Sequence, residues 1–298
     1  MKLFIRTSLL VIFLVSATLL PLYAEDLMVE YLEGILEVGQ GSNWIEVDIG
    51  DTIPQNSYLR LSDNGLAELS AGAITITLNQ DGTFSIKNLL TSGREVAAWN
   101  ISSLVNSKLA RLISPDQQQG TAVMGVRGAA AGDEELTWVE EGEEYLEQGK
   151  ELIRTGDYKE AREVLQEGAD YSFSDEEKEE YNFYIASAYA LEGKSAPALL
   201  MLTNMKTESS TPYYSDYVLL KGKLLIEGLA YKKALLLFDQ YLKKPDRSET
   251  TQLIYFLSAL CNQRLENRRD AISNLEAAYE INNSSEYGRA ARRMMDNL

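Results

Sequence analysis

The sequence contains no histidine and a single cysteine, and this narrows the chemistry open to the chain. Without histidine, Ser-His-Asp and Cys-His nucleophile systems, histidine-containing zinc sites and facial-triad iron sites are excluded. Cys261 cannot form an internal disulfide, and its apolar neighbours predict a buried core residue. Phosphate-loop, dinucleotide-binding and nucleophile-elbow motifs are also missing. We therefore expect a non-enzymatic protein without catalytic, cofactor-binding or metal-binding residues.

Basic residues are scarce relative to acidic ones. The 298 residues include 28 Lys and Arg but 45 Asp and Glu, which gives a formal net charge of −17. Such an acidic protein repels phosphate backbones, so we do not expect nucleic acid as a partner. Hydrophobic residues make up 45% of the chain, and this content with this length predicts about two packed domains.

The N-terminus has the pattern of a secretory signal peptide. Lys2 and Arg6 precede an apolar run over 8–20, and the small residue Ala24 precedes two acidic residues. The run is shorter than the roughly 20 residues that span a bilayer, and no cysteine follows it for lipid attachment. We expect residues 1–24 to direct export to the periplasm. An uncleaved inner-membrane anchor is the alternative.

Short segments with alternating apolar residues recur through residues 27–90. Turn signals such as Asn64-Gly65 and Asp81-Gly82 separate them, and two-residue hairpins favour these dipeptides because both positions tolerate positive φ. The pattern predicts an antiparallel β-sandwich or barrel-like sheet. The expected strands are 35–38, 44–47, 58–61, 67–69, 74–78 and 83–86, with a last strand near 136–139.

Residues 94–113 change to a helical period. Ile101, Val105 and Leu109 are four residues apart, with Lys108 among them, which predicts an amphipathic helix. Pro115 and the polar residues that follow it predict the end of this helix and a loop.

Four sequence patterns in this order resemble the FecR domain of exported bacterial proteins: Gly34-Ile35-Leu36-Glu37-Val38, Trp44-x-x-Val47-x-x-Gly50-Asp51-x-Ile53, Ala67-x-Leu69 and Thr121-Ala122-Val123-x-Gly125-Val126-Arg127-Gly128. The resemblance covers about residues 29–139 and implies a β-domain over 25–140, in which the helix at 94–113 is an insertion. The family usually continues with threonine after the last pattern, whereas this chain has Ala129. The resemblance also implies a FecR-type signalling regulator as one alternative function.

The rest of the chain is helical and repetitive. Four alanines, each closing a turn-like motif, are 37, 36 and 37 residues apart, and each has a small residue twelve positions before it and a large apolar residue four positions after it. The alanines are Ala161, Ala198, Ala234 and Ala271; the small residues are Gly149, Ala186, Gly222 and Ala259; the large ones are Leu165, Leu202, Phe238 and Leu275.

These positions resemble the signature of the tetratricopeptide repeat (TPR), a helix–turn–helix unit with a period of about 34 residues. The resemblance implies an all-α solenoid of helical hairpins over residues 141–298. Its four repeats would cover about 142–175, 179–212, 215–248 and 252–285, and a C-terminal helix over 285–298 would cap the last one.

The TPR resemblance implies that the first helix of each repeat lines a concave groove. Basic residues beside an apolar ladder on this face favour a peptide with apolar anchors and an acidic end. The alternative is that the apolar residues pack between repeats. The expected partner-binding residues are Leu146, Lys150 and Arg154 in the first repeat, Phe183 in the second, Leu219 and Lys223 in the third, and Phe256 and Arg264 in the fourth.

The sequence therefore predicts a protein-protein interaction scaffold of the cell envelope. One alternative is a structural protein that binds peptidoglycan through exposed aromatic residues of the β-domain, with Trp44 and Trp99 as the candidates. A carboxylate-based hydrolase is a further alternative, and it requires two acidic side chains that converge in one cleft.

Overall fold

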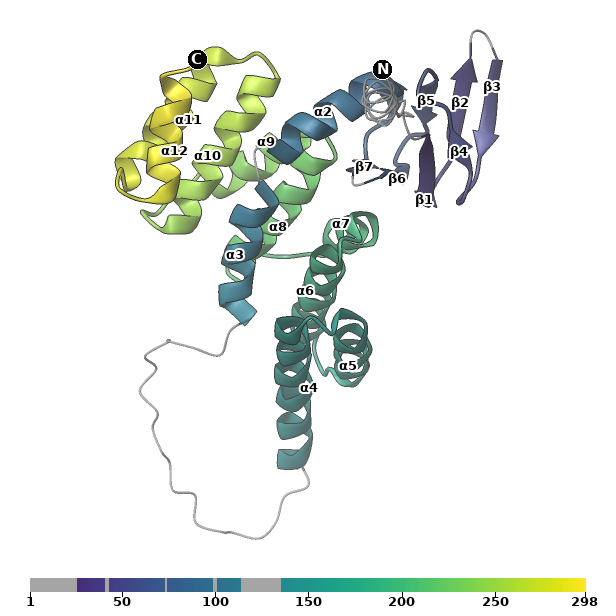
Figure 1. The fold of residues 1–298 in the computed structure, drawn as a ribbon. Helices are drawn as coiled ribbons and strands as arrows, with labels where there is room; N and C mark the ends of the chain where they lie inside the picture. Colours follow the sequence, from purple (N-terminus) through teal and green to yellow (C-terminus); the bar gives the residue numbers. More distant parts are fainter. Residues whose placement is uncertain (1–25, 41–42, 73, 99–100, 114–134) are drawn as a thin grey trace, which may run out of the picture.

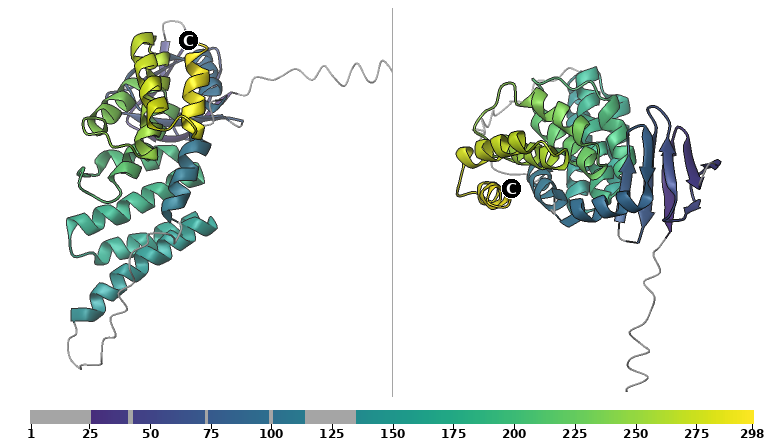
Figure 2. Two further views of the ribbon diagram at one scale, coloured as in Figure 1. Left: turned by 90° about the vertical axis from the view of Figure 1, so that its left-hand side faces the viewer. Right: turned by 90° about the horizontal axis from the view of Figure 1, so that it is seen from above.

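The computed structural model describes residues 26–40, 43–72, 74–98, 101–113 and 135–298. The expected signal peptide, Trp99 and the segment 121–128 lie outside these residues. Within the described residues, two antiparallel sheets come first and helices follow, and the sheets lie at one side of the helical part (Figures 1 and 2). The predicted order of a β part and an α part is thus confirmed.

Each sheet has four strands. The first has the order β4-β1-β6-β7 and the second the order β3-β2-β5-β8. Leu36 and Leu59 of the second sheet share one buried core with Leu69 and Ile76 of the first. The strand bounds are Leu27–Glu33 (β1), Leu36–Gln40 (β2), Asn43–Val47 (β3), Thr52–Ile53 (β4), Tyr58–Leu61 (β5), Leu66–Ala71 (β6), Ile74–Leu78 (β7) and Gly82–Ser85 (β8).

The sequence patterns did not predict β1 and β4 as separate strands. β1 pairs with β6, but its register shifts between Val29 and Tyr31. Such an irregularity interrupts the period-two alternation by which a strand is recognised. β4 is too short, at two residues, to carry any alternation.

Helices make up the remainder of the described chain. The helix bounds are Ile86–Ala98 (α2), Ile101–Ile113 (α3), Glu135–Thr155 (α4), Tyr158–Tyr171 (α5), Asp175–Glu192 (α6), Ser195–Asn204 (α7), Tyr214–Glu227 (α8), Tyr231–Tyr241 (α9), Glu249–Arg264 (α10), Arg268–Ile281 (α11) and Glu286–Met295 (α12). Consecutive helices from α4 to α11 pack against each other, and α12 packs against α10 and α11.

Two expectations need correction. The helix predicted at 94–113 is two helices, because Ile86 and Leu90 already anchor α2 in the core of the sheets. The strand predicted near 136–139 lies inside α4 instead. Glutamates, which are good helix formers, flank this segment at 135, 140 and 141, and the two-residue alternation that suggested a strand is short.

The helical hairpins repeat in backbone conformation. The turn after the first helix of each pair contains one residue in the left-handed region: Gly156, Gly193, Leu229 and Glu266, with φ of 91°, 89°, 57° and 60°. Each lies five positions before one of the four regularly spaced alanines. The spacing read from the sequence therefore corresponds to a repeated turn.

The small and large residues of the repeat meet inside the hairpins. A Cβ added at Gly149 would lie 2.3 Å from Leu165 Cδ2, and one added at Gly222 would lie 2.2 Å from Phe238 Cε1. The four large residues are 0% exposed. Small side chains thus allow the first helix of a pair to approach the second closely.

Candidate functional site

α3 lies along helices that open the hairpins. It packs against α8 and α4 (Figure 1). Ile101, Val105 and Leu109 of α3 are 3%, 0% and 1% exposed and belong to the same hydrophobic core as these helices. Their four-residue spacing places the three side chains on one side of the helix. We call the surfaces of α4 and α8 under α3, together with Glu249 at the start of α10, the α3-binding face.

Two ion pairs connect α2 and α3 to α10. Lys108 Nζ of α3 is 2.8 Å from Glu249 Oε2, and the lysine side chain is only 17% exposed. Arg264 at the other end of α10 pairs with Glu95 of α2. Since α2 begins directly after β8, these contacts link the sheets to the fourth hairpin.

A buried carboxylate lies beneath Lys108. Asp216, in the first turn of α8, is 5% exposed. Burial raises the pKa of Asp216 to about 6, although a hydrogen bond from the Ser215 hydroxyl and the charge of Lys108 lower it. Lys108 is therefore close to the N-terminal end of α8, whereas Ile101 lines a cavity with Glu227 at the C-terminal end. α3 runs antiparallel to α8.

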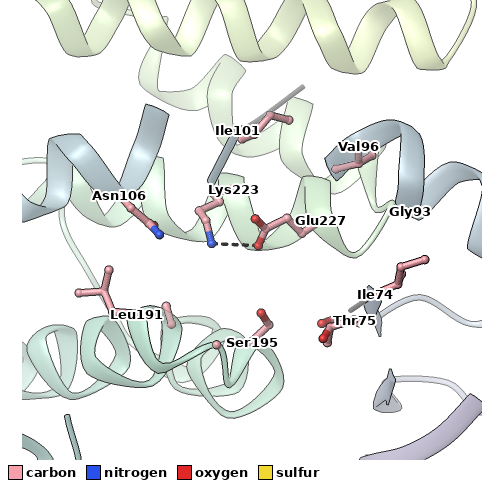
Figure 3. A pocket seen from close by; sticks show the side chains of 13 residues that line it. Ile74, Thr75, Gly93, Val96, Ile101, Asn106, Leu191, Ser195, Lys223 and Glu227 are labelled. Atoms are coloured by element: carbon pink, nitrogen blue, oxygen red, sulfur yellow. Dashed lines mark hydrogen bonds and ion pairs between the residues drawn. The ribbon is translucent and has the colours of Figure 1, made fainter. Parts of the chain in front are cut away.

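This cavity has a volume of about 400 Å³ and lies between β7, α2, α3, α8 and the α6–α7 turn (Figure 3). On its α8 side, Lys223 is 3% exposed and its Nζ donates a hydrogen bond to Glu227 Oε2 at 2.9 Å. On its α3 side, Asn106 Oδ1 is buried and has no hydrogen-bond partner among the described residues. Ile101 and Leu191 add apolar surface. The cavity is thus lined by both polar and apolar groups.

A second buried carboxylate joins the first sheet to α7. Glu68 on β6 is 8% exposed and accepts a hydrogen bond of 2.7 Å from the backbone N–H of Ala196 in the first turn of α7. A carboxylate at a helix N-terminus is stabilised by the helix dipole. Burial raises the pKa of Glu68, and the hydrogen bond from Ala196 opposes this effect.

The end of α8 also contacts the sheet. A Cβ added at Gly228 would lie 2.5 Å from the carbonyl oxygen of Thr77, so only glycine fits there. Gln80 donates a hydrogen bond of 3.4 Å to the Leu229 carbonyl, and Lys233 donates one to the Asn79 carbonyl. These contacts hold the sheet against the third hairpin without involving α3.

Four of the predicted partner-binding residues are buried. Phe183, Leu219, Lys223 and Phe256 are 1%, 0%, 3% and 4% exposed. The Phe183 ring stacks on Tyr213 with 4.9 Å between the ring centroids. The apolar members therefore contact other side chains of the protein in this structure, and Lys223 faces the cavity beside α3.

The other four predicted residues are more accessible. Leu146 and Lys150 are half-buried, and Arg154 is exposed and paired with Glu151 one turn earlier. The Lys150 ammonium bonds to Glu147 at 2.9 Å, and Arg264 pairs with Glu95 as described above. The structure thus brings Lys223 and Arg264 near α2 and α3, whereas Arg154 lies apart at the surface.

The outer face of the second sheet carries aromatic and charged side chains. Trp44 and Tyr58 lie on either side of Gly39 in the pairing register, and Tyr58 is 53% exposed. A Cβ added at Gly39 would be 2.9 Å from the Trp44 ring, so the ring lies against this glycine. The Arg60 guanidinium is 4.4 Å from the centre of the Trp44 ring and pairs with Glu37 at 2.6 Å. This hydrogen bond lowers the pKa of Glu37.

Sequence reasoning missed Glu68 and Asn106 as functional candidates. Glu68 carries a usable signal, since it is the one charged residue of its strand and lies between Ala67 and Leu69. Asn106 carries no comparable signal, because one asparagine on a helix is ordinary. Asn106 is of interest only because it lines the same cavity as Lys223, a residue far away in the sequence.

In the ranges that the structure describes, no group of three or more acidic or cysteine side chains is arranged to hold a metal ion. None of the described helices has the length and apolar character needed to cross a membrane. Cys261 is buried, as expected, and burial raises the pKa of its thiol. No family model matches the chain, and a search of curated proteins finds no match either.

Proposed function

We propose that this chain is a non-enzymatic adaptor of the bacterial cell envelope, built from a FecR-like β-domain and a TPR-like helical array that binds a partner protein. The observation that carries the proposal is the repeated turn. Left-handed residues recur at Gly156, Gly193, Leu229 and Glu266, in register with the alanine spacing. Stacked helical hairpins of this kind bury a continuous core and present extended surfaces for binding.

The hairpin contacts support the same proposal. The glycines at 149 and 222 each meet a large side chain of the second helix, as the TPR signature implies. The pre-organised helices would limit the entropy lost when a partner binds. The signal-like N-terminus supports a function outside the cytoplasm, and the acidic composition favours protein over nucleic acid as the partner.

Photo-crosslinking in the native host tests this function. A photo-reactive residue at Leu146 or Arg154, on the first helix of the array, should capture one and the same envelope protein. The matched control is Gln166, an exposed residue on the second helix of the same hairpin. Capture that is equal at Gln166, or absent at both first-helix positions in a folded and exported protein, would contradict a binding role for this face.

A second candidate function is peptidoglycan binding by the β-domain. The aromatic face of the second sheet favours it, because exposed rings flanked by hydrogen-bonding groups suit sugar rings, which are apolar on one face and polar at the edge. Here Tyr58 is exposed, and Arg60 and Glu37 supply the polar groups.

Sedimentation with purified cell-wall material tests this second candidate. Tyr58→Ala and Trp44→Ala should each reduce the bound fraction severalfold. Phe173→Ala is the control, since Phe173 is 75% exposed but belongs to the helical part. Equal binding by all three variants and the unaltered protein would remove the aromatic face as a glycan site.

A further inference from the structure

α3 covers the α3-binding face but leaves a cavity beside it and a buried oxygen that is unpaired among the described residues. Its three anchors are completely buried, which shows that the face accepts an amphipathic helix with apolar residues at every fourth position. Ser103 points away and is exposed, so the helix is attached by one side. The face is therefore complementary in shape to a helix and not to an extended strand.

The charges around this face set a second requirement. Glu249 pairs with Lys108 of α3, and the carboxylate of Asp216 is buried beside it. A helix bound here would keep the ion pair with Glu249 and the favourable charge near Asp216 only if it carried a basic residue at the position of Lys108, one before the third anchor. The face therefore requires a positive charge at one defined position of the bound helix.

The cavity shows where α3 fits poorly. Asn106 Oδ1 lies in the cavity lining and is buried without a partner among the described residues. On the α8 side of the cavity, the Lys223 ammonium donates its one hydrogen bond within the described residues to Glu227 (Figure 3). A buried acceptor without a donor is unfavourable. A longer side chain with an oxygen acceptor, such as glutamine, would extend into the cavity toward Lys223.

We propose that the α3-binding face is a docking site for an amphipathic helix of a partner protein, and that α3 occupies this site in cis until the partner displaces it. The partner helix carries apolar anchors at its first, fifth and ninth positions, glutamine or another long acceptor at the sixth and a basic residue at the eighth. This inference rests on the proposed adaptor function and adds to it the class of partner and the means by which the site is kept covered.

The probe for the test is a fluorescent peptide with the sequence of residues 101–113 and Asn106→Gln. Val105→Asp in the full chain places a charge in the middle of the buried anchors and should release α3. Ser103→Asp adds the same charge to the exposed side of α3 and is the control. Because a site that is mostly covered binds with proportionally reduced affinity, the probe should bind Val105→Asp roughly tenfold or more tightly than the control or the unaltered chain.

A peptide with the unaltered sequence should bind Val105→Asp about threefold more weakly than the probe, as expected for the loss of one hydrogen bond. Equal affinity of the probe for all three chains, or no binding to a folded Val105→Asp chain, would overturn the proposal. If Val105→Asp does not fold, hydrogen exchange of the unaltered chain tests the proposal instead. A saturating probe should accelerate exchange at the amides of α3, and unchanged protection would overturn the proposal.

These results are distinguishable from failure of the adaptor function itself. A chain that captures an envelope protein at Leu146, but whose α3 remains protected when that partner or the probe is bound, remains an adaptor. In that case the partner binds elsewhere on the helices and α3 is a permanent part of the fold. A chain that captures nothing but releases α3 to the probe loses the adaptor function and keeps the helix-binding face.

Discussion

The close contact between Gly222 and Phe238 gives the most direct test of how the hairpins pack. In Gly222→Ala, the new Cβ would lie 2.2 Å from Phe238 Cε1 and 2.4 Å from Cζ. The ring is 0% exposed, so it cannot turn out into solvent to make room. Overpacking of this kind costs about 1–3 kcal/mol, whereas alanine is better than glycine in a helix by about 1 kcal/mol. We expect a net loss of about 0–2 kcal/mol in the free energy of unfolding.

The other hairpins indicate which second substitution should compensate for Gly222→Ala. The second and fourth hairpins combine alanine with leucine at these two positions, as Ala186 with Leu202 and Ala259 with Leu275. Phe238→Leu alone should lose roughly 1 kcal/mol through the smaller apolar volume. When it is combined with Gly222→Ala, the steric conflict disappears and the helix gains alanine. The double variant should therefore be at least about 1 kcal/mol more stable than the sum of the single effects.

Urea denaturation followed by far-ultraviolet circular dichroism measures all four chains of this cycle. The slope of the free energy with urea concentration should stay constant, because the folded state is the same. If Gly222→Ala stabilises the chain by about 1 kcal/mol, only helix propensity matters and the hairpins do not pack as described. Additive effects of the two substitutions would lead to the same conclusion.

Three further predictions concern the turns and the buried carboxylates. Glu266→Gly should stabilise the chain by about 0.5–1 kcal/mol in urea denaturation because it relieves the left-handed conformation, and Gly156→Ala should have the opposite sign, whereas equal signs would refute this explanation. Glu68→Ala should lower the free energy of unfolding by about 1–3 kcal/mol by leaving the Ala196 N–H without an acceptor, and a change below about 0.5 kcal/mol would show that water replaces the carboxylate. Because burial raises the pKa of Asp216 from 3.8 to about 6, its contribution to stability is present below pH 4 and is lost as the pH rises to about 6. Asp216→Asn should remove up to about 3 kcal/mol of this pH dependence, and an unchanged pH profile of urea denaturation would contradict the raised pKa.

Short sequence patterns predicted those strands and helical hairpins that are determined by residues close together in the chain. The alternation of Ile74, Ile76 and Leu78 indicated β7 because these side chains pack into the shared core of the sheets. The alanine spacing indicated the hairpins because the same turn conformation recurs with it. In both cases, the information needed lies within a few residues of the chain. The β-hairpins expected at Asn64-Gly65 and Asp81-Gly82 do not form, because the strands on either side of each dipeptide belong to different sheets.

The place of α3 was not predictable in this way. The spacing of Ile101, Val105 and Leu109 shows that one side of the helix is buried, but it does not show which surface covers that side. The cover is α8 and α4, which follow in sequence and were interpreted as lining an open groove. For the same reason Lys223 was assigned to a partner, whereas it faces a cavity that α3 partly closes.

The contacts between the sheets and the helices separate into two groups, and this separation matters for the release of α3. Glu68 with Ala196, and Gly228 against Thr77, join the first sheet to α7 and α8 without α3. Lys108 with Glu249 depends on α3 itself. Displacement of α3 would break the Lys108–Glu249 pair and expose its three buried anchors but would leave the first group intact, so the β part would stay docked while the α3-binding face opens. A partner would need to compete with one short helix and not with the whole interface between the domains, which keeps the free energy required within the range of a single helix-in-groove interaction.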